Sequence, residues 1–566
     1  MNNVVKKWGA QIVVGIIAVI HTCLSFITDK NIFVFPDKAS SGYNAAVFDY
    51  VVCKLLTLAA LFAIYSIIYS IIRKDRADHT PYQIAVSALP YIIVLLAVAA
   101  IKLPQGYLSN DEYAIYNDAV NLTHSTWFCY LTPYYYTVSL MILPFKYAPI
   151  IFKLIIEYGV VGYVTYRSKQ YFGKRIGLIS YVLFLLYPVI AYTTSAHRLP
   201  IYFLLYLCLF AKMLYDRLEH KGISAAGMAG MLLTGAVLTQ WRTEGIYLAA
   251  LVPILMLVVY YPYIICGKSQ ACGSDDDGVD AHNGGNDSDN ADTHNADSDA
   301  AAEADSTNNE TISRAGRIAR LGMFIAASLI FQIIVSYPQN AFSSAALDDA
   351  ANDRMKPFYA YTITNMYRNG LDLDKNREDL QIVDRYLSLE AIAAINEHYE
   401  DINYEDVLIL YQDGFVGVRE DATVQDFIDY SDALKRIFVN NPDVFLRTRV
   451  GAFGYSALPY HISYSGMGLK SLLSFGLSLV KSLSYNLFIP LIVVVVLLIY
   501  SLIRKRWFDF FVAGGLLCHW FIVFILAPAS YFKYYFPLYI MAYFYILLGV
   551  MSFIKNRKLP ESSRQR

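Results

Sequence analysis

Two adjacent carboxylates, Asp111 and Glu112, stand directly after Asn110 at the end of an apolar stretch. A carboxylate at a membrane surface can act as a general base that deprotonates an attacking hydroxyl. Neighbouring residues on a helix do not face each other, so one acid would be the base and the other an orienting group. Alternatively, Asn110 caps a helix whose positive end favours both acids. Both interpretations remain open at this stage.

Cations occur in three further polar turns between apolar stretches. His197 and Arg198 share one turn, Arg242 and Glu244 share a second, and Lys533 lies in an aromatic turn near the C-terminus. An arginine fork can bind a phosphate, although Arg242 can equally pair with Glu244. Arg198 can also be an arginine that only extends its charge to the water at the membrane surface and binds no ligand. Lys533 by itself does not indicate a binding site. Together, these acids and cations are what the handling of a lipid-linked phosphate requires.

The elements that must position these residues are membrane-spanning helices. The chain has 566 residues, of which 56% are hydrophobic and only 16% charged, and its net charge of −1 argues against nucleic-acid binding. A spanning helix needs about 20 mostly apolar residues. We predict an all-α polytopic membrane protein with about twelve transmembrane helices. They are placed at residues 9–28, 48–72, 82–103, 148–166, 176–193, 199–216, 222–240, 244–265, 318–336, 484–503, 507–527 and 533–553.

The distribution of lysine and arginine predicts the orientation of these helices. Alternate short loops at 73–76, 167–175, 217–221 and 504–506, together with the C-terminal tail, are rich in Lys and Arg, whereas the loops on the other side carry few. Because cytoplasmic loops carry the excess of positive charge, both termini are predicted to be cytoplasmic, in a multi-pass protein of the plasma membrane.

Two hydrophilic segments interrupt the spans. Residues 268–312 consist mainly of Asp, Asn, Ser, Gly and Ala, which is typical of a disordered acidic linker. Residues 337–483 show helical periodicity with ordinary charge, which predicts an inserted, mainly α-helical extracytoplasmic domain. The predicted order is spans 1–3 (1–103), an extracytoplasmic acidic loop with amphipathic helices (104–147), spans 4–8 (148–265), the disordered cytoplasmic loop (266–317), span 9 (318–336), the inserted domain (337–483), spans 10–12 (484–553) and a cytoplasmic tail (554–566).

The order of these features resembles the GT-C superfamily of polytopic glycosyltransferases, which includes protein O-mannosyltransferases and lipid A aminoarabinose transferases. The resemblance rests on Asn110-Asp111-Glu112-Tyr113 after an early span, the segment 131-LTPYYYTVSLMILPFKY-147, the basic turn 167-RSKQYFGKR-175, outer turns with Arg198 and Arg242, and 531-YFKYYFP-537. It covers roughly residues 80–265 and 484–553. Two features depart from the family pattern: three spans precede the acidic loop instead of one, and a domain is inserted between late spans.

The resemblance implies a role for each candidate residue. Asp111 would be the catalytic base or the group that orients the acceptor, with Glu112 beside it. Arg198, Arg242 and Lys533 would bind the donor phosphate. Asn110, His197 and Glu244 would support them. The implied activity is transfer of a sugar from a polyprenyl-phosphate donor to an envelope glycan, lipid or protein at the outer face, which makes the chain a hexosyltransferase-like enzyme surrounded by membrane lipids.

Two other classes of function remain open: a transporter or flippase of lipid-linked saccharides, and a polymerase or ligase without the GT-C fold. A transporter would place ionisable groups in the middle of its spans and show internal repeats. The sequence suggests polar groups at span ends instead. The seven cysteines form no metal-binding pattern, so no metal ligand and no cofactor is assigned, although a divalent metal is compatible with the acids.

Overall fold

The computed structural model describes residues 2–40, 42–73, 79–102, 110–123, 128–193, 198–266, 313–345, 347–399, 407, 410, 417–460 and 469–557. Within these ranges the chain forms helices and no strand, apart from one isolated bridge between Leu387 and Val418. The N-terminal half contains α1 (Asn2–Asp29), α2 (Tyr43–Ile72), α3 (Thr80–Ala88), α4 (Ile92–Lys102), α5 (Asn110–Asn121), α6 (Leu131–Ile142), α7 (Ala148–Phe172), α8 (Tyr181–Leu185), α9 (Tyr187–Thr193), α10 (Arg198–Leu218), α11 (Ala225–Trp241) and α12 (Leu248–Ile264).

The C-terminal half is helical as well. It contains α13 (Arg314–Ala345), α14 (Leu347–Arg368), α15 (Arg377–Tyr386), α16 (Leu389–His398), α18 (Val424–Asn440), α19 (Pro442–Ala457), α20 (Leu469–Ser484), α21 (Phe488–Ile503), α22 (Trp507–Leu526) and α23 (Phe536–Arg557). Short 3₁₀ helices join several of these, among them η5 (Thr243–Tyr247) and η6 (Phe532–Tyr535). The prediction of an all-helical chain is therefore confirmed for the described residues.

Ten helices in the described part of the chain are long and apolar enough to cross a membrane. An eleventh span results if the helices at 176–185 and 187–193, which meet at an angle of 58°, are counted together. The predicted span 222–240 corresponds to α11, whose 17 residues fall short of the roughly 20 needed for a bilayer. A membrane-spanning protein is thus supported, while the exact number of about twelve spans stays a prediction.

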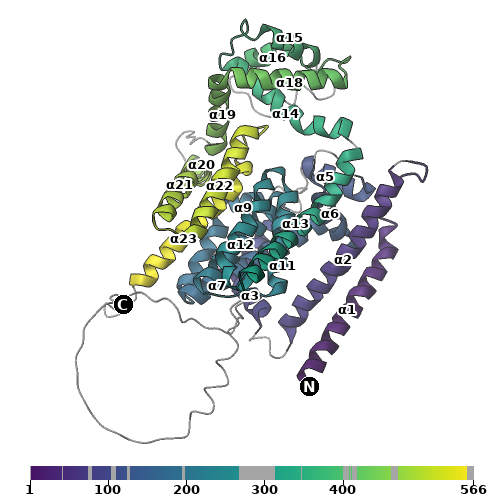
Figure 1. Cartoon of the computed structure of the whole chain (residues 1–566), viewed down its shortest axis with the longest axis vertical. Helices are drawn as coiled ribbons and strands as arrows, with labels where there is room; N and C mark the ends of the chain where they lie inside the picture. The colour runs from purple at the N-terminus through teal and green to yellow at the C-terminus, as the bar shows by residue number, and fades with distance from the viewer. Residues whose placement is uncertain are drawn as a thin grey trace, which may run out of the picture.

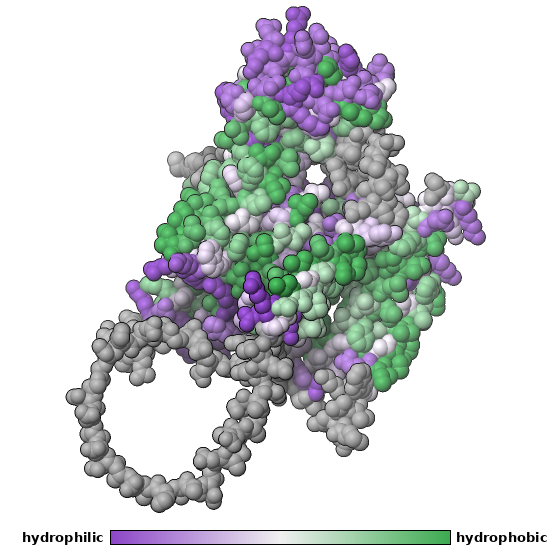
Figure 2. All heavy atoms as spheres, viewed as in Figure 1, coloured by the Kyte–Doolittle hydropathy of each residue, from purple (hydrophilic) through white to green (hydrophobic). Residues whose placement is uncertain are grey.

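The central span is α10, which packs against α7, α11, α12 and α23. Of the most apolar 18-residue part of α10, 83% is buried inside the protein, against 17% for α1 and 11% for α13. A helix that is apolar on all sides and buried belongs to the centre of a bundle, whereas α1 and α13 present apolar side chains outward, as lipid-facing helices do. Figure 2 shows apolar residues over the middle of the molecule, a large group of hydrophilic residues at its top, and smaller hydrophilic patches toward the opposite end. Arg198, the first residue of α10, therefore lies at the end of the central helix.

The helices α14 to α19 form a second unit with its own apolar core. Its buried residues run from Phe358 to Ala452 and form a cluster separate from that of the membrane bundle. The amphipathic helix α18 begins with a capping box in which Thr423 and Asp426 bond each other's backbone N–H groups. The hydrogen bonds from Thr423 lower the pKa of Asp426 below its ordinary value. The helical periodicity of the sequence therefore predicted real helices here.

The start of α1 at Asn2 and the end of α23 at Arg557 lie at the end of the bundle opposite the α15–α16–α18 unit (Figure 1). At the end where α7 and α10 finish, Arg167 pairs with Asp216 at 2.9 Å and with Glu219 at 3.1 Å. Nearby Arg217 and Arg506 pair with Asp509 at 3.3 and 2.9 Å. Basic residues of several loops are thus gathered at one end, as the charge asymmetry predicts, but the side of the membrane on which this end lies remains a prediction.

A buried arginine joins the second unit to the bundle. Arg449 on α19 is 1% exposed and donates to the carbonyl oxygens of Phe524 (2.7 Å) and Ala527 (2.8 Å), at the C-terminal end of α22. The last carbonyls of a helix lack partners within it and carry partial negative charge, so a guanidinium is a favourable cap. Burial lowers the pKa of Arg449 from its ordinary value, and these carbonyl bonds hold the charge in place.

We predict that Arg449→Met weakens the attachment of the second unit. The variant leaves two buried carbonyls without donors, which costs about 1–3 kcal/mol per group. The expected result is a lower unfolding temperature in detergent and faster proteolysis between α19 and α20. Arg447→Met is the matched control, because Arg447 lies on the same helix with an exposed side chain. Equal stability of the two variants would contradict this role of Arg449.

Candidate functional site

The structure brings Asp111 and Arg198 together although 87 residues separate them in the chain. Nη2 of Arg198 lies 2.7 Å from Oδ2 of Asp111, and the two side chains are 20% and 41% exposed. Asp111 lies in the first turn of α5, and Arg198 begins α10. The ring of Phe128 lies 4.7 Å from the guanidinium carbon of Arg198 and covers it. The pair is therefore partly open to solvent, with its arginine held against an aromatic face.

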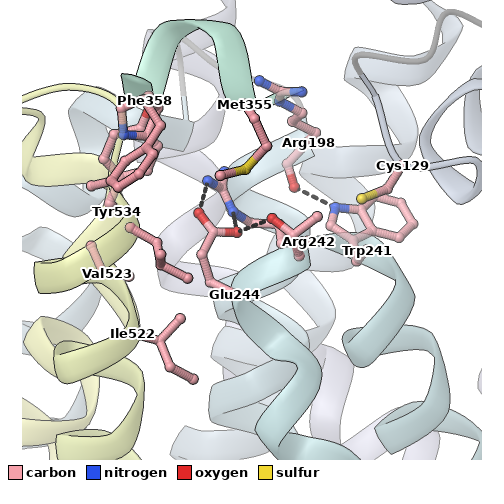
Figure 3. Close-up of a pocket in the computed structure, with 14 residues that line it drawn as sticks. Cys129, Arg198, Trp241, Arg242, Glu244, Met355, Phe358, Ile522, Val523 and Tyr534 are labelled. Atoms are coloured by element: carbon pink, nitrogen blue, oxygen red, sulfur yellow. Dashed lines mark hydrogen bonds and ion pairs between the residues drawn. The ribbon is translucent and has the colours of Figure 1, made fainter. Parts of the chain in front are cut away.

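Arg242 and Glu244 form a second ion pair in the tight turn between α11 and α12. Nε and Nη2 of Arg242 lie 3.2 and 2.6 Å from the two carboxylate oxygens of Glu244, an arrangement that Figure 3 shows. Burial alone would lower the pKa of Arg242, but the paired Glu244 carboxylate raises it above its ordinary value. The interpretation of Glu244 as a support for Arg242 is consistent with this geometry. Nη1 of Arg242 lies outside the pair.

The two arginines line one cavity of about 340 Å³ (Figure 3). Trp241 connects the two ion pairs, because its indole N–H donates to the carbonyl oxygen of Arg198 at 2.6 Å and the next residue is Arg242. The rest of the wall is largely apolar. Its apolar part comes from α14, from the end of α22 and from the residues that follow α22, and includes Met355, Phe358, Ile522, Val523, Leu526, Ala527 and Pro528. Cys129, Thr243, Glu244 and Tyr534 complete the lining. A cavity of this kind, mostly apolar with a few polar groups at one side, is typical of a site for a small ligand.

Lys533 approaches the same place from η6. Its ammonium lies 4.6 Å from the ring centre of Tyr531 and 5.8 Å from that of Tyr534. The guanidinium of Arg242 lies 5.6 Å from the same Tyr534 ring, which also lines the cavity. The charges of Asp111, Arg198 and Arg242 all act on the Lys533 ammonium. The structure therefore gathers the four charged residues at one end of the bundle, although Lys533 itself does not line the cavity.

The remaining predicted residues differ in position. Glu112 is 1% exposed, so it lies on the buried side of the turn whose other acid, Asp111, is partly open. Its charge acts on Lys533 and on Lys153, a buried residue of α7. The side chain of Asn110 and the whole of His197 lie outside the described residues. The choice between a cap and a supporting residue for Asn110 therefore stays open.

Sequence reasoning missed several residues of the site. Trp241 and Tyr534 stand beside Arg242 and Lys533 in the chain, so the aromatic character of both turns was a usable signal. Met355 and Phe358 belong to the segment assigned to the inserted domain, and nothing in their local sequence indicates contact with the bundle. The second unit therefore contributes part of the cavity wall, although its apolar core is separate from that of the bundle.

The spans contain more buried charge than the sequence suggests. Lys54 and Asp29 form an ion pair between α2 and α1, and Asp49 accepts hydrogen bonds from Tyr130 and Tyr134. Lys153 and Glu157 on α7 are both fully buried. The interpretation that polar groups lie only at span ends is therefore wrong. The mean hydropathy of a span hardly changes when one residue is charged, and the partner that stabilises this charge lies on another helix.

No metal centre is found within the described ranges: no three His, Cys, Asp or Glu side chains are grouped as metal ligands would be. A comparison with models of known protein families finds no match to the chain. Comparisons with curated proteins and with solved structures likewise find no relative.

Proposed function

We propose that the chain is an integral membrane glycosyltransferase of the GT-C type. It would move a sugar from a polyprenyl-phosphate donor to a cell-envelope acceptor at the end of the bundle that carries the cavity. The observation that supports this most is the convergence of Asp111, Arg198, Arg242 and Lys533, from four separate parts of the chain, beside one largely apolar cavity. A lipid-linked phosphate needs cations and an apolar surface next to each other.

The ion pairs suggest how the reaction would proceed. Asp111 takes the proton of the acceptor hydroxyl as that oxygen bonds to the anomeric carbon of the sugar. The bond between the anomeric carbon and the phosphate oxygen breaks, and the polyprenyl phosphate leaves with one additional negative charge. Protonation removes the charge of Asp111, so Arg198, which it held at 2.7 Å, becomes available to the leaving phosphate. Arg242 and Lys533 complete the positive surroundings.

One specific observation favours a second candidate, a flippase of lipid-linked saccharides. Ionisable groups buried inside spans often mark the path of a transported group, and Lys54, Asp49, Lys153 and Glu157 are such groups. Each of them has a charged or hydroxyl partner in the protein, as a structural charge would. Transfer is therefore the preferred proposal, and transport is the alternative to test.

One experiment separates the two. The full chain, reconstituted in liposomes, is supplied with a polyprenyl-phosphate hexose labelled in the sugar and with envelope extract as acceptor. The proposal predicts that label appears in a product no longer attached to the polyprenyl phosphate. Movement of intact donor between leaflets, with the bond to phosphate unbroken, would instead establish the flippase.

The proposal also predicts the topology of the chain. Two variants carry a single cysteine each, one in place of Glu420 in the second unit and one in place of Arg504 in the basic loop before α22. Only one of the two cysteines should react with an impermeant thiol reagent in intact cells. Both positions are exposed, so access depends on the side of the membrane alone. Position 420 should be labelled from outside and position 504 only after permeabilisation. Equal labelling, or the reverse, would contradict an outward-facing site.

A further inference from the structure

A buried histidine of α22 lies between the two turns that carry Arg242 and Lys533. His519 is 1% exposed, and its Nε2 atom lies 2.9 Å from the backbone carbonyl oxygen of Tyr534 in η6. A carbonyl oxygen can only accept a hydrogen bond, so Nε2 of His519 carries the proton of this bond. His519 therefore fixes the backbone of η6 at the residue that follows Lys533.

The local sequence explains why this carbonyl is open to a donor from another helix. In a 3₁₀ helix, the carbonyl oxygen of residue i accepts from the N–H of residue i+3. For Tyr534 that residue is Pro537, which has no N–H to donate. The ring of His519 supplies a donor at this point, where η6 ends and α23 begins.

A second neighbour of the His519 ring belongs to the turn that carries Arg242. The centres of the His519 and Tyr247 rings lie 5.7 Å apart, and Tyr247 is the last residue of η5. The Tyr247 hydroxyl donates to the hydroxyl of Tyr206 on α10 at 3.3 Å. This end of η5 is thus held between α10 and α22, and the same histidine contacts both turns.

The Arg242 turn is also fixed to the bundle from its other side. A Cβ atom at Gly245, in this turn, would lie 2.6 Å from the carbonyl oxygen of Leu238 and 3.1 Å from the hydroxyl of Tyr202. The first distance is a clash, so the close approach of the turn to α10 and α11 requires glycine. Because η5 is packed so tightly, the position of η6 decides how far Lys533 lies from Arg242.

We propose that His519 is a positioning residue that holds η6 against the Arg242 turn and so sets the spacing between Lys533 and Arg242. Tyr534 completes this link: its ring lines the cavity, and the ring centre lies 5.6 Å from the Arg242 guanidinium and 5.8 Å from the Lys533 ammonium (Figure 3). His519 is not among the described residues that line the cavity. The importance of this spacing for a phosphate rests on the proposed function, whereas the hydrogen bond from His519 does not.

The first test observes the His519 ring directly and needs no substrate. The full chain is produced with isotope-labelled histidine, and the signals of His519 are identified by their absence in His519→Gln. Solid-state NMR of the protein in lipid bilayers should show that Nε2 of His519 carries a proton at neutral pH and that this proton exchanges slowly with water. An unprotonated Nε2, or an Nε2 proton that exchanges quickly, would overturn the proposal.

The second test compares the binding of polyprenyl phosphate with that of the corresponding polyprenol, which lacks the phosphate. His519→Gln and His519→Asn both introduce an amide, but only the glutamine amide reaches the position of the histidine Nε2. His519→Asn should therefore weaken the binding of polyprenyl phosphate about 10-fold, whereas His519→Gln should keep most of the affinity. Both variants should bind polyprenol as the wild type does, because the apolar wall is unchanged.

Trp520→Phe is the matched control. It keeps an aromatic ring and removes the buried N–H of the neighbouring residue, which bonds to no group in the described part of the chain. This variant should bind both lipids like the wild type. Equal affinities of His519→Asn and His519→Gln for polyprenyl phosphate, or an equal loss of polyprenol binding in His519→Asn, would contradict the positioning role.

A double variant shows whether the effect of His519 passes through Lys533. In a chain that already carries Lys533→Gln, His519→Asn should weaken the binding of polyprenyl phosphate much less than it does in the wild type. Additive losses would contradict a role through Lys533. A wild-type chain that binds polyprenyl phosphate no better than polyprenol would refute the proposed function, and the NMR result would still decide whether His519 holds η6.

Discussion

Asp111→Asn is expected to lower the rate of sugar transfer about 10²–10⁴-fold, the usual loss when a general base is removed. Asparagine has nearly the same size and is as good a helix cap as aspartate, so the first turn of α5 should keep its structure. The measurement is transfer from labelled polyprenyl-phosphate donor at matched protein levels. Asp118→Asn, on the same helix two turns further along, is the matched control and should retain the wild-type rate.

The ion pair requires one further comparison, because Asp111→Asn also removes the partner of Arg198. If Asp111 only neutralises that arginine, then Asp111→Asn in a chain carrying Arg198→Gln should cause no further loss. If Asp111 is the base, Asp111→Asn should still lower the transfer rate about 10²-fold or more in the Arg198→Gln background. Wild-type transfer by Asp111→Asn alone would exclude Asp111 from the mechanism and leave Glu112 as the next candidate.

Arg242→Ala is expected to raise the KM for the donor about 10- to 100-fold while kcat changes much less. A hydrogen bond to a charged group contributes about 1.5–3 kcal/mol, and about 1.4 kcal/mol corresponds to a factor of ten in affinity. Arg242 lines the cavity, but its fork is shared with Glu244, so the free carboxylate in Arg242→Ala would itself repel a phosphate.

Two variants separate the loss of the arginine from the exposure of the carboxylate: the single variant Glu244→Gln and the double variant Glu244→Gln/Arg242→Ala. The second variant lacks the arginine without exposing a carboxylate, so its KM relative to the first reports the arginine alone. Arg242→Lys keeps the charge but not the fork, and should have an intermediate KM. An unchanged KM in the double variant would show that the donor phosphate does not contact Arg242.

The helices and the general location of the site were predictable from the sequence because both depend on local patterns. Runs of apolar residues identify spans, and polar turns between them identify the ends of the bundle. The turns with Arg198, Arg242 and Lys533 stand out for that reason. Their pairing is only partly evident. The short spacing of Arg242 and Glu244 suggests that they pair within their turn, whereas nothing in the sequence indicates that Asp111 selects Arg198.

What could not be predicted depends on contacts between distant segments. Lys153 and Glu157 lie inside an apolar stretch and are stabilised by Thr193 and Tyr91 from other helices. Arg449 finds its partners on α22, 75 residues away. Such groups tolerate burial only because their partners are present. Since those partners follow from the fold, local hydropathy predicts neither the buried charges nor the wall that Met355 and Phe358 contribute.

The most direct test of the central claim is a structure of the full chain determined with polyprenyl phosphate bound. The claim is that one cavity holds the phosphate between Arg198 and Arg242, with Lys533 close by and the prenyl chain along the apolar wall formed by α22. We predict a phosphate within hydrogen-bond distance of both guanidinium groups. A phosphate bound elsewhere on the bundle, or a cavity that stays without lipid at saturating polyprenyl phosphate, would contradict the account.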